Sequence, residues 1–540
     1  MDKKLVFNGS TTRPVDNAAE EMTVGRDSVT GCIPYLYDFK LKPTFTVSDG
    51  TTVKIDGVEQ TSGVSEVDFS KPVVYTLSNG EETREFTVAV TNSGLPVVVL
   101  TQSGGGSESW AEAGINVRAK DADWVETDKM AVYKADGSVD MEEAFCGIRL
   151  RGNSTQKFPK KPFAVKLVDK APVLGMPQHK RWVLLANWMD RTMLRNAVAF
   201  EVAHQIENAY VDGLGWNPHG YSVEVIMDGR HVGNYYLCEQ IKIDGDRVDI
   251  KDCIEDIIGD GNANPTMADC GYLLEFDDNY DEVDKFRTGR GLPCMFKDEV
   301  SKYSADIFNQ VKARIETVES NLETENYEAA YSDLDINSVI DYFFIQELTF
   351  NDEYKHPKSV YMLIDGDGKL TAGPVWDFDW QTFINYDKVQ VMNSKYGGTY
   401  DCRKNNEWLY GASKLAEKTS WWPGSDYDYE NDMPYMWYPL LFKDANFRAR
   451  VQERWAVIYP QLLNVVDKID EFAAQNKVSE QYNSAMWPLV SLKNSVGSAF
   501  NGDEDMSFNE AIATMKQAYT DRLNWMNMQI TSGNFVTDAE

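Results

Sequence analysis

The stretch LTAGPVWDFDW, residues 370–380, decides how this sequence is interpreted. The apolar residues Val375, Trp376 and Phe378 surround two carboxylates, Asp377 and Asp379. Side chains two residues apart leave the same face of a β-strand, so a strand here would present both carboxylates together. Carboxylate oxygens are the ligands that Mg²⁺ prefers in phosphoryl-transfer sites. The stretch therefore predicts either a strand with one solvent-facing side or a divalent-metal site.

The length and charge of the chain limit its architecture and its partners. A chain of 540 residues predicts two to four domains. The net charge of −32 repels nucleic acid and anionic membranes, so we expect neither as a partner. An anionic substrate such as a nucleotide would need local Lys or Arg residues and a bound cation. No window of about 18 apolar residues occurs, so we expect no transmembrane segment.

The seven cysteines are scattered, without a C-x-x-C motif or zinc-ligand spacing. We expect them to be free and mostly buried, with at most one disulfide. The N-terminal residues MDKKLVFNGS contain no apolar signal core. The sequence thus describes either a cytosolic protein or an exported one whose leader is absent.

Residues 1–94 have the pattern of an all-β module. Short alternating strands are separated by turns at Asp49-Gly50, Asp56-Gly57 and Asn79-Gly80. The run SEVDFSKPVVYTLSNG followed by REFTVAV resembles the Ig-like modules that precede functional domains in bacterial cell-surface proteins. We expect a β-sandwich with its boundary at residues 92–95, where Asn-Ser-Gly precedes the apolar run LPVVVL.

A cationic block follows in GIRLRGNSTQKFPKKPFAVKL, residues 147–167. Two β-runs, 148–151 and 162–167, flank a polar turn, which predicts a hairpin. In a chain this acidic the block is either a solvated basic hairpin or an anion site, since Arg and Lys neutralise phosphate oxygens. Alternation places Lys161 and Lys166 on opposite faces, and we favour Lys166 because the other face is apolar.

Four motifs occur in order along the chain. They are RGNST (151–155), KKPF.VKL (160–167), LGMP..K.WVLLAN..D.T.LRN (174–196) and GP.WDFDW (373–380). Together they resemble the spore-coat protein H (CotH) kinase family, over residues from about 95 to about 530. The resemblance implies an α+β atypical protein-kinase-like domain at 95–540 that transfers the γ-phosphoryl group of ATP to Ser or Thr, with Mg²⁺ or Mn²⁺. It also implies an exported protein of the cell envelope or cell surface.

The resemblance assigns roles to eight residues. Asp377, with Asp379, is expected to hold the metal, and Asp352 to accept or orient the proton of the acceptor hydroxyl. The expected phosphate-binding and nucleotide-cleft residues are Arg151, Lys161, Lys166, Glu239 and Glu275. Among these, Glu239 would pair with the phosphate-binding lysine, as the corresponding glutamate does in kinases.

The periodicity predicts the elements around these residues. Apolar positions from Val300 to Leu322 advance by three or four, which predicts a helix with one packed side. Asp335 is a plausible N-cap of the next helix, and either Asp190 or Thr192 can cap a helix that carries Leu194, Val198 and Val202. Hairpin turns are predicted at 228–229 and 365–368.

Two segments leave the assignment of activity open. NDEYKHPKS, residues 351–359, departs from the family pattern, because Pro357 and Lys358 stand where amides are common. The aromatic insertion at 385–440 predicts either a surface for a sugar or peptide acceptor or an irregular cap on the cleft, and we favour the cap. Residues 440–530 predict the closing helices of the domain.

Two other classes of protein compete with the kinase interpretation. One is a catalytically degenerate cell-surface adhesion protein that binds glycan or protein on a kinase-like scaffold. The other is a glycoside hydrolase that uses Asp377 or Asp379 as acid. We disfavour the second, because these residues would lie only about 7 Å apart along one strand, whereas such enzymes draw their carboxylates from separate elements.

The first testable prediction is metal-dependent ATP binding. Phosphates should bind this acidic chain weakly unless a divalent cation offsets the repulsion. We expect calorimetry to give a higher ATP affinity in millimolar Mg²⁺ or Mn²⁺ than in chelator. Equal affinities under the two conditions would exclude the proposed metal site.

Overall fold

The computed structural model describes residues 5–8, 20–21, 23–210, 212–259, 261–262, 264–351, 357–384, 392–393, 398–399, 406–411, 436–489 and 501–537. The chain forms two compact units. The first contains residues 1–186, 220–240 and 474–488, and the second contains residues 187–219, 241–473 and 489–540. Among the described residues, no helix is long and apolar enough to cross a membrane.

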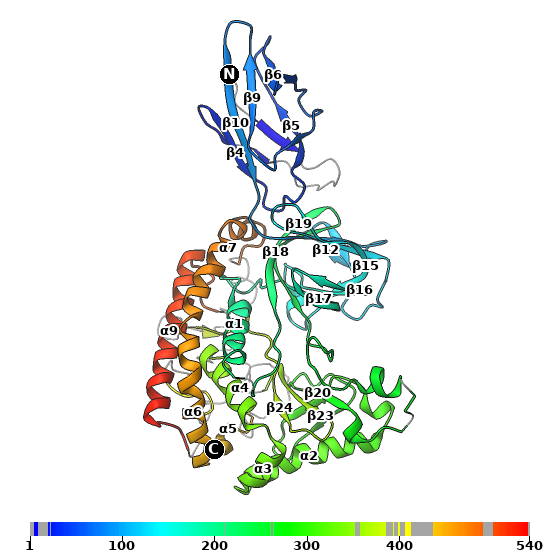
Figure 1. Ribbon diagram of the computed structural model, residues 1–540, viewed down its shortest axis with the longest axis vertical. Helices are drawn as coiled ribbons and strands as arrows, with labels where there is room; N and C mark the ends of the chain where they lie inside the picture. Colours follow the sequence, from blue (N-terminus) through cyan, green and yellow to red (C-terminus); the bar gives the residue numbers. More distant parts are fainter. Residues whose placement is uncertain are drawn as a thin grey trace. The chain divides into compact units, whose positions relative to one another are not determined.

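The first unit begins with two β-sheets (Figure 1). One sheet has the order β2-β1-β5-β8, with β1 (Leu5–Asn8), β2 (Glu20–Glu21), β5 (Lys40–Phe45) and β8 (Val67–Asp68). The other has the order β3-β4-β10-β9-β6-β7, with β3 (Thr23–Val24), β4 (Ser28–Cys32), β6 (Thr52–Ile55), β7 (Val58–Glu59), β9 (Val73–Ser78) and β10 (Thr83–Thr91). Inward-facing side chains such as Val29, Leu41, Tyr75 and Val88 share one buried core. The predicted β-rich N-terminal region is therefore present.

A closed seven-stranded barrel follows in the same unit, with the order β11-β14-β15-β16-β17-β19-β18. Its strands are β11 (Val97–Thr101), β14 (Asp128–Tyr133), β15 (Val139–Leu150), β16 (Phe163–Val173), β17 (Met176–Leu185), β18 (Gly220–Met227) and β19 (Arg230–Glu239). The ribbon β12 (Glu108–Trp110) and β13 (Ile115–Val117) and the short 3-10 helix η1 (Thr155–Lys157) complete the region. The predicted hairpin at Asp228-Gly229 joins β18 to β19, and β15 pairs antiparallel with β16 across the cationic turn.

The core of the sandwich continues into the barrel. Val97, Ala131, Tyr133 and Ile226 of the barrel belong to the same buried cluster as the sandwich residues. Tyr37 stacks on Tyr133 with ring centroids 4.4 Å apart. The sandwich therefore covers apolar barrel surface, although the sequence predicted two separate cores with a boundary at residues 92–95.

The second unit contains an antiparallel sheet with the order β21-β22-β20-β23-β24. Its strands are β20 (Gly271–Phe276), β21 (Lys285–Arg287), β22 (Pro293–Phe296), β23 (Val360–Asp365) and β24 (Thr371–Ala372). The predicted turn at 365–368 joins β23 to β24. Short elements of this unit are η2 (Cys253–Ile258), η3 (Met267–Asp269), η4 (Val300–Lys302), β25 (Met392–Asn393) and β26 (Gly398–Thr399).

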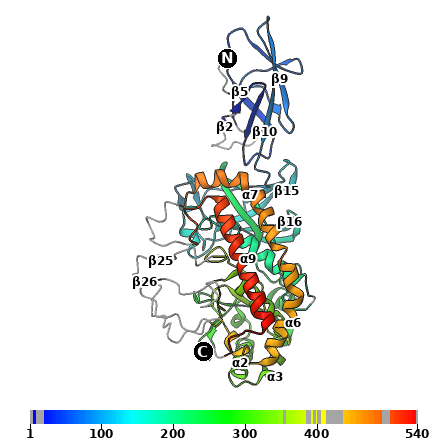
Figure 2. The same ribbon diagram turned by 90° about the vertical axis from the view of Figure 1, so that its left-hand side faces the viewer.

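The helices of this unit are α1 (Arg195–Glu207), α2 (Ala305–Glu323), α3 (Tyr327–Asp333), α4 (Ile336–Thr349), α5 (Tyr438–Leu441), α6 (Ala445–Leu462), the first half of α7 (Val465–Met486) and α9 (Phe508–Ser532). Helices α6 and α9 lie side by side in both views (Figure 1, Figure 2). Asp335 caps α4 as predicted, accepting hydrogen bonds from the backbone N–H groups of Asn337 and Ser338. The predicted helix over 300–322 begins only at Ala305, because Ser304 accepts from the N–H of Ile307 and caps it there.

One disulfide joins Cys253 to Cys270, while Cys146 and Cys294 are buried free thiols. This agrees with the expectation of at most one bridge among the described cysteines. The bridge fixes the chain just before β20, the strand that carries Glu275.

The shared core gives a prediction for the fragment 95–540. Removing the sandwich exposes Ala131, Tyr133 and Ile226 to water, but the closed barrel keeps its own core. We expect the fragment to unfold cooperatively, with a Tm lowered by roughly 5 °C relative to the full chain. Differential scanning calorimetry of both proteins measures this, and a fragment without a cooperative transition would show that sandwich and barrel are one domain.

Candidate active site

The stretch that contains Asp377 and Asp379 is an irregular loop rather than a strand. Strand β24 ends at Ala372, and residues 373–378 have no regular secondary structure. Asp377 has a positive φ of 68°, and Gln381 and Phe383 have φ values of 51° and 52°. The expectation that a strand presents both carboxylates on one face is therefore wrong. The apolar side chains whose alternation suggested a strand instead hold the loop in place.

Apolar side chains anchor this loop on helix α1. Val375 and Phe378 are fully buried, and Trp376 is nearly so. The rings of Trp376 and Phe378 both pack on Phe200, at centroid distances of 5.9 and 6.4 Å. Asp377 lies between these two anchors and remains partly exposed. The buried aromatic residues thus hold a carboxylate at the surface of the core.

Buried amide side chains bind the backbone of the loop. The N–H of Val375 donates to Oδ1 of Asn217 at 3.0 Å, and the N–H of Phe378 donates to Oδ1 of Asn196 at 2.8 Å. Asn501 accepts from the N–H of Gln381 at 2.6 Å and donates to the carbonyl oxygen of Asp379 at 3.0 Å. An irregular buried backbone needs such partners, because strand pairing does not supply them. The sequence did not predict these roles.

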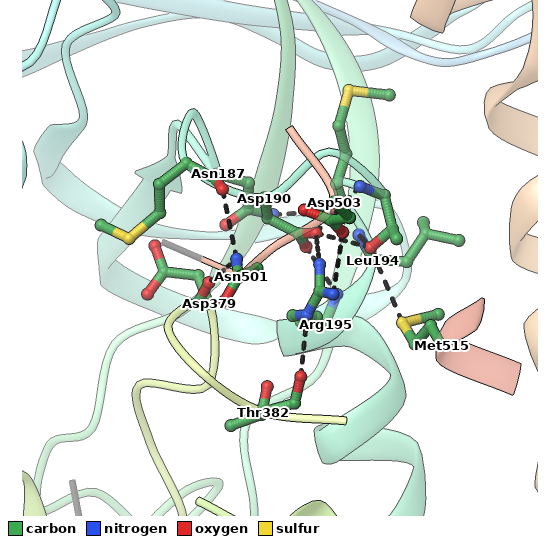
Figure 3. A network of polar contacts seen from close by, with 12 residues as sticks. Asn187, Asp190, Leu194, Arg195, Asp379, Thr382, Asn501, Asp503 and Met515 are labelled. Carbon is green, nitrogen blue, oxygen red and sulfur yellow. Dashed lines mark hydrogen bonds and ion pairs between the residues drawn. The ribbon is translucent and has the colours of Figure 1, made fainter. Parts of the chain in front are cut away.

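An ion-pair network supports the far end of the loop (Figure 3). Arg195, the first residue of α1, donates Nε–H to the carbonyl oxygen of Thr382 at 2.9 Å. Its guanidinium also pairs with Asp190 and, at 2.9 Å, with Asp503. Asp190 accepts from the N–H groups of Arg195 and Thr192, but the N-cap of α1 is Leu194, so the prediction that Asp190 or Thr192 occupies the N-cap is wrong. Burial raises the pKa of Asp503 to about 6, although Arg195 acts against that shift.

A second group of carboxylates lies beside Asp377. The N–H of Ser359 donates to Asp277 at 3.1 Å, and the Ser359 hydroxyl donates to Asp377 at 3.5 Å. Asp277 follows β20 directly, and Glu275 lies within that strand. Lys297 pairs with Glu275 at 2.6 Å. The structure therefore brings Glu275 and Asp377 into one neighbourhood. It also places Asp277 and Ser359 beside Asp377, and the sequence did not predict this contact.

The donor set around Asp377 fits a hard divalent cation. Asp377, Asp277 and Ser359 offer only oxygen atoms, which Mg²⁺ and Mn²⁺ prefer. In the described part of the chain, no group of three or more His, Cys, Asp or Glu residues is placed to hold a metal ion. A cation here would thus take further ligands from phosphate or water, as Mg²⁺ usually does. The Asp379 carboxylate points away from the Arg195 network (Figure 3).

The predicted phosphate-binding residues belong to the first unit. Arg151 donates its backbone N–H to Pro162, and Lys161 donates Nζ–H to the carbonyl oxygen of Gln156. Lys166 is about one-third exposed, and its Nζ lies 4.0 Å from Glu126. Glu239 is fully buried at the end of β19, where it pairs in register with Trp182. Asp352 lies outside the described residues, as does most of the aromatic insertion at 385–440.

The fold defines a multidomain protein with a β-rich N-terminal region followed by an α/β region. The family model described as CotH kinase protein matches residues 148–526, well over half of the chain. The chain therefore belongs to the CotH kinase protein family, as the motifs predicted. A model described as SGBP, N-terminal, matches residues 15–90.

No curated protein is significantly similar to the chain. A crystal structure from Bacteroides thetaiotaomicron VPI-5482, described as a proposed glycoside hydrolase, is 16% identical with a TM-score of 0.12. That match covers 30% of this chain and 47% of the other, so it spans less than half of the solved protein. A TM-score this low assigns neither fold nor activity.

The environment of Asp277 predicts a pH-dependent stability. Burial, together with repulsion from Glu275, raises the pKa of Asp277 to about 7. Because an unfolded aspartate has a pKa of about 3.9, folding favours the protonated carboxyl, and this stabilisation is lost as the pH rises from about 4 through 7. Asp277→Asn imitates the neutral form, although its one amide oxygen accepts from only one of the two N–H groups, of Ser359 and Asn279, that Asp277 binds. We compare the free energy of unfolding of Asp277→Asn with that of wild type. This difference should be on the order of 2 kcal/mol more in favour of the variant at pH 8 than at pH 5.

Urea unfolding at both pH values, with metal removed by chelator, measures this gain. The matched control is Asp367→Asn, which changes an exposed turn carboxylate of the same sheet region. If the two variants respond equally to pH, the burial of Asp277 is not the cause.

Proposed function

We propose that the chain is an atypical protein kinase that transfers the γ-phosphoryl group of ATP to Ser or Thr of a secreted or cell-surface protein. Membership in the CotH kinase protein family supports this proposal. The single observation that carries it is the Asp377 loop, where the motif residues converge. Asn196 of the LRN motif binds the N–H of Phe378 in the WDFD motif, across 182 positions of sequence. Two motifs of the family thus build one carboxylate-bearing loop.

Each residue has a proposed role in the reaction. Asp377, with Asp379, holds Mg²⁺ or Mn²⁺, and the cation supplies charge neutralisation on the β- and γ-phosphates when bound. In the first unit, Lys166 or Lys161 and Arg151 neutralise phosphate charge, and Glu239 orients the lysine. Glu275 lines the nucleotide site, and Asp352 orients the acceptor hydroxyl. Catalysis then rests on positioning and electrostatic stabilisation, as expected for phosphoryl transfer.

We also infer a kinase-like α+β domain and a location at the cell surface. The sheet of the second unit, its helices and the Asp377 loop support a kinase-like α+β arrangement. The SGBP-type N-terminal module supports association with a surface. The Cys253–Cys270 disulfide is typical of oxidising compartments and agrees with export.

A catalytically degenerate surface protein that binds protein or glycan is the second candidate. The segment NDEYKHPKS favours it, because this segment departs from the family pattern where Asp352 is assigned. The N-terminal module also favours a binding function, since such a module can serve attachment without catalysis. ATP binding without any transfer or hydrolysis would identify this second function.

The test of the kinase proposal is Asp377→Asn. This change keeps the size of the side chain but removes the charge that anchors the cation, and such a metal clamp stabilises the transition state by several kcal/mol. Phosphoryl transfer from labelled ATP to a generic Ser/Thr acceptor should fall by about a hundredfold to a thousandfold. Asp352→Asn should lower the rate of transfer less than Asp377→Asn does if Asp352 only orients the acceptor hydroxyl.

The matched control is Asp56→Asn, which makes the same change at an exposed turn aspartate that also has a positive φ. It should leave the rate unchanged. A wild-type rate in Asp377→Asn would remove Asp377 from the metal site.

A further inference from the structure

The segment just before the C-terminal helix α9 reaches into the candidate active site. Asn501 is about 1% exposed and makes three hydrogen bonds with its side chain. Its Oδ1 accepts from the N–H of Gln381 at 2.6 Å. Its Nδ2 donates to the carbonyl oxygens of Asp379 at 3.0 Å and of Met189 at 3.2 Å. One amide thus binds the backbone on both sides of residue 380.

These contacts require both a donor and an acceptor on one side chain. Only an amide offers two N–H donors and a carbonyl acceptor at this length. Gln381 has a positive φ of 51°, so its N–H does not continue a regular ladder and depends on this acceptor. Asn501 therefore fixes the direction in which the chain leaves Asp379.

The same segment is held at three further points. Asp503 pairs with Arg195, which itself binds the carbonyl oxygen of Thr382 (Figure 3). The carbonyl oxygen of Met506 accepts from Nε of Arg191 at 3.0 Å. Ser507 then caps α9, with Glu510 completing a capping box. The segment that carries Asn501 is thus bound to Arg191, to the first residue of α1 and to the start of α9.

We propose that Asn501 is a positioning residue for the metal-binding loop and that the C-terminal segment 501–507 sets the conformation of residues 377–382. This inference rests on the proposed function for its catalytic consequence. Asn501 acts through the backbone of Asp379 and Gln381, not through contact with the nucleotide. Its loss should loosen the loop and lower kcat, while the KM for ATP stays nearly constant.

The test uses the full-length variant Asn501→Ala and hydrogen exchange with mass spectrometry of peptides covering 373–384. We expect exchange in these peptides to accelerate about tenfold or more. The N–H of Gln381 loses its acceptor, and the carbonyl oxygen of Asp379 loses its donor. With Mn²⁺ and ATP, kcat should fall by about tenfold with a change in KM below about twofold. Asn501→Asp, which keeps the acceptor for Gln381 but loses both donors, should accelerate exchange of the Gln381 N–H less than Asn501→Ala does.

The matched control is Asn234→Ala in the first unit. Asn234 is also buried, and its amide donates to Asn476 and Ser479 at 2.9 and 3.0 Å within the first unit, whereas the Asp377 loop belongs to the second. Unchanged exchange at 373–384 in Asn501→Ala, or an equal change in both variants, would overturn the inference. If wild type transfers no phosphate, the kinase proposal fails, and the exchange comparison alone decides whether Asn501 positions the loop.

Discussion

The candidate site depends on one constraint: a buried, irregular stretch of backbone must find hydrogen-bond partners outside a sheet. Residues 373–384 follow β24 and adopt positive φ at four positions, and beyond the hydrogen bond from the N–H of Gly373 to Tyr361 no strand pairs with them. Asn196, Asn217 and Asn501 supply those partners, and Arg195 supplies one more. The fold therefore needs buried amide side chains from distant parts of the chain to hold Asp377 on a fixed but irregular loop.

The packing follows from the same constraint. Trp376 and Phe378 press on Phe200, so the helix that carries Arg195 and Asn196 at its start also provides the apolar surface beneath the loop. Helix α4 is almost entirely buried and fixes β24 through the hydroxyl of Ser338, which accepts from the N–H of Ala372. Apolar contacts thus set where the loop lies, and polar contacts set which way its carbonyl and N–H groups point.

Local patterns in the sequence predicted the regular elements well. The helix cap at Asp335, the hairpin turns at 228–229 and 365–368 and the apolar face of α2 are confirmed, because each depends on residues within one turn or one hairpin. The strand through Asp377 was wrong, because an apolar alternation of a few residues does not distinguish a strand from a loop pinned by aromatic side chains. The amide anchors could not be predicted, since Asn196 and Asn501 lie 182 and 120 positions from the groups they bind. The one available signal was the ordered set of motifs, which placed Asn196 in a family pattern without indicating its partner.

The charged groups around the loop are largely paired with one another. Arg195 pairs with two carboxylates, Asp190 and Asp503, so its positive charge is balanced within this cluster. On the other side, Lys297 is committed to Glu275 and Glu282, and Ser359 joins Asp277 to Asp377 with neutral donors only. Burial and the negative charge of Glu275 therefore keep the pKa of Asp277 high. A divalent cation at Asp377 would reverse that balance, because its charge favours ionised carboxylates. Burial and Glu275 thus destabilise the ionised form of Asp277, and the nearby Lys358 offsets this only in part.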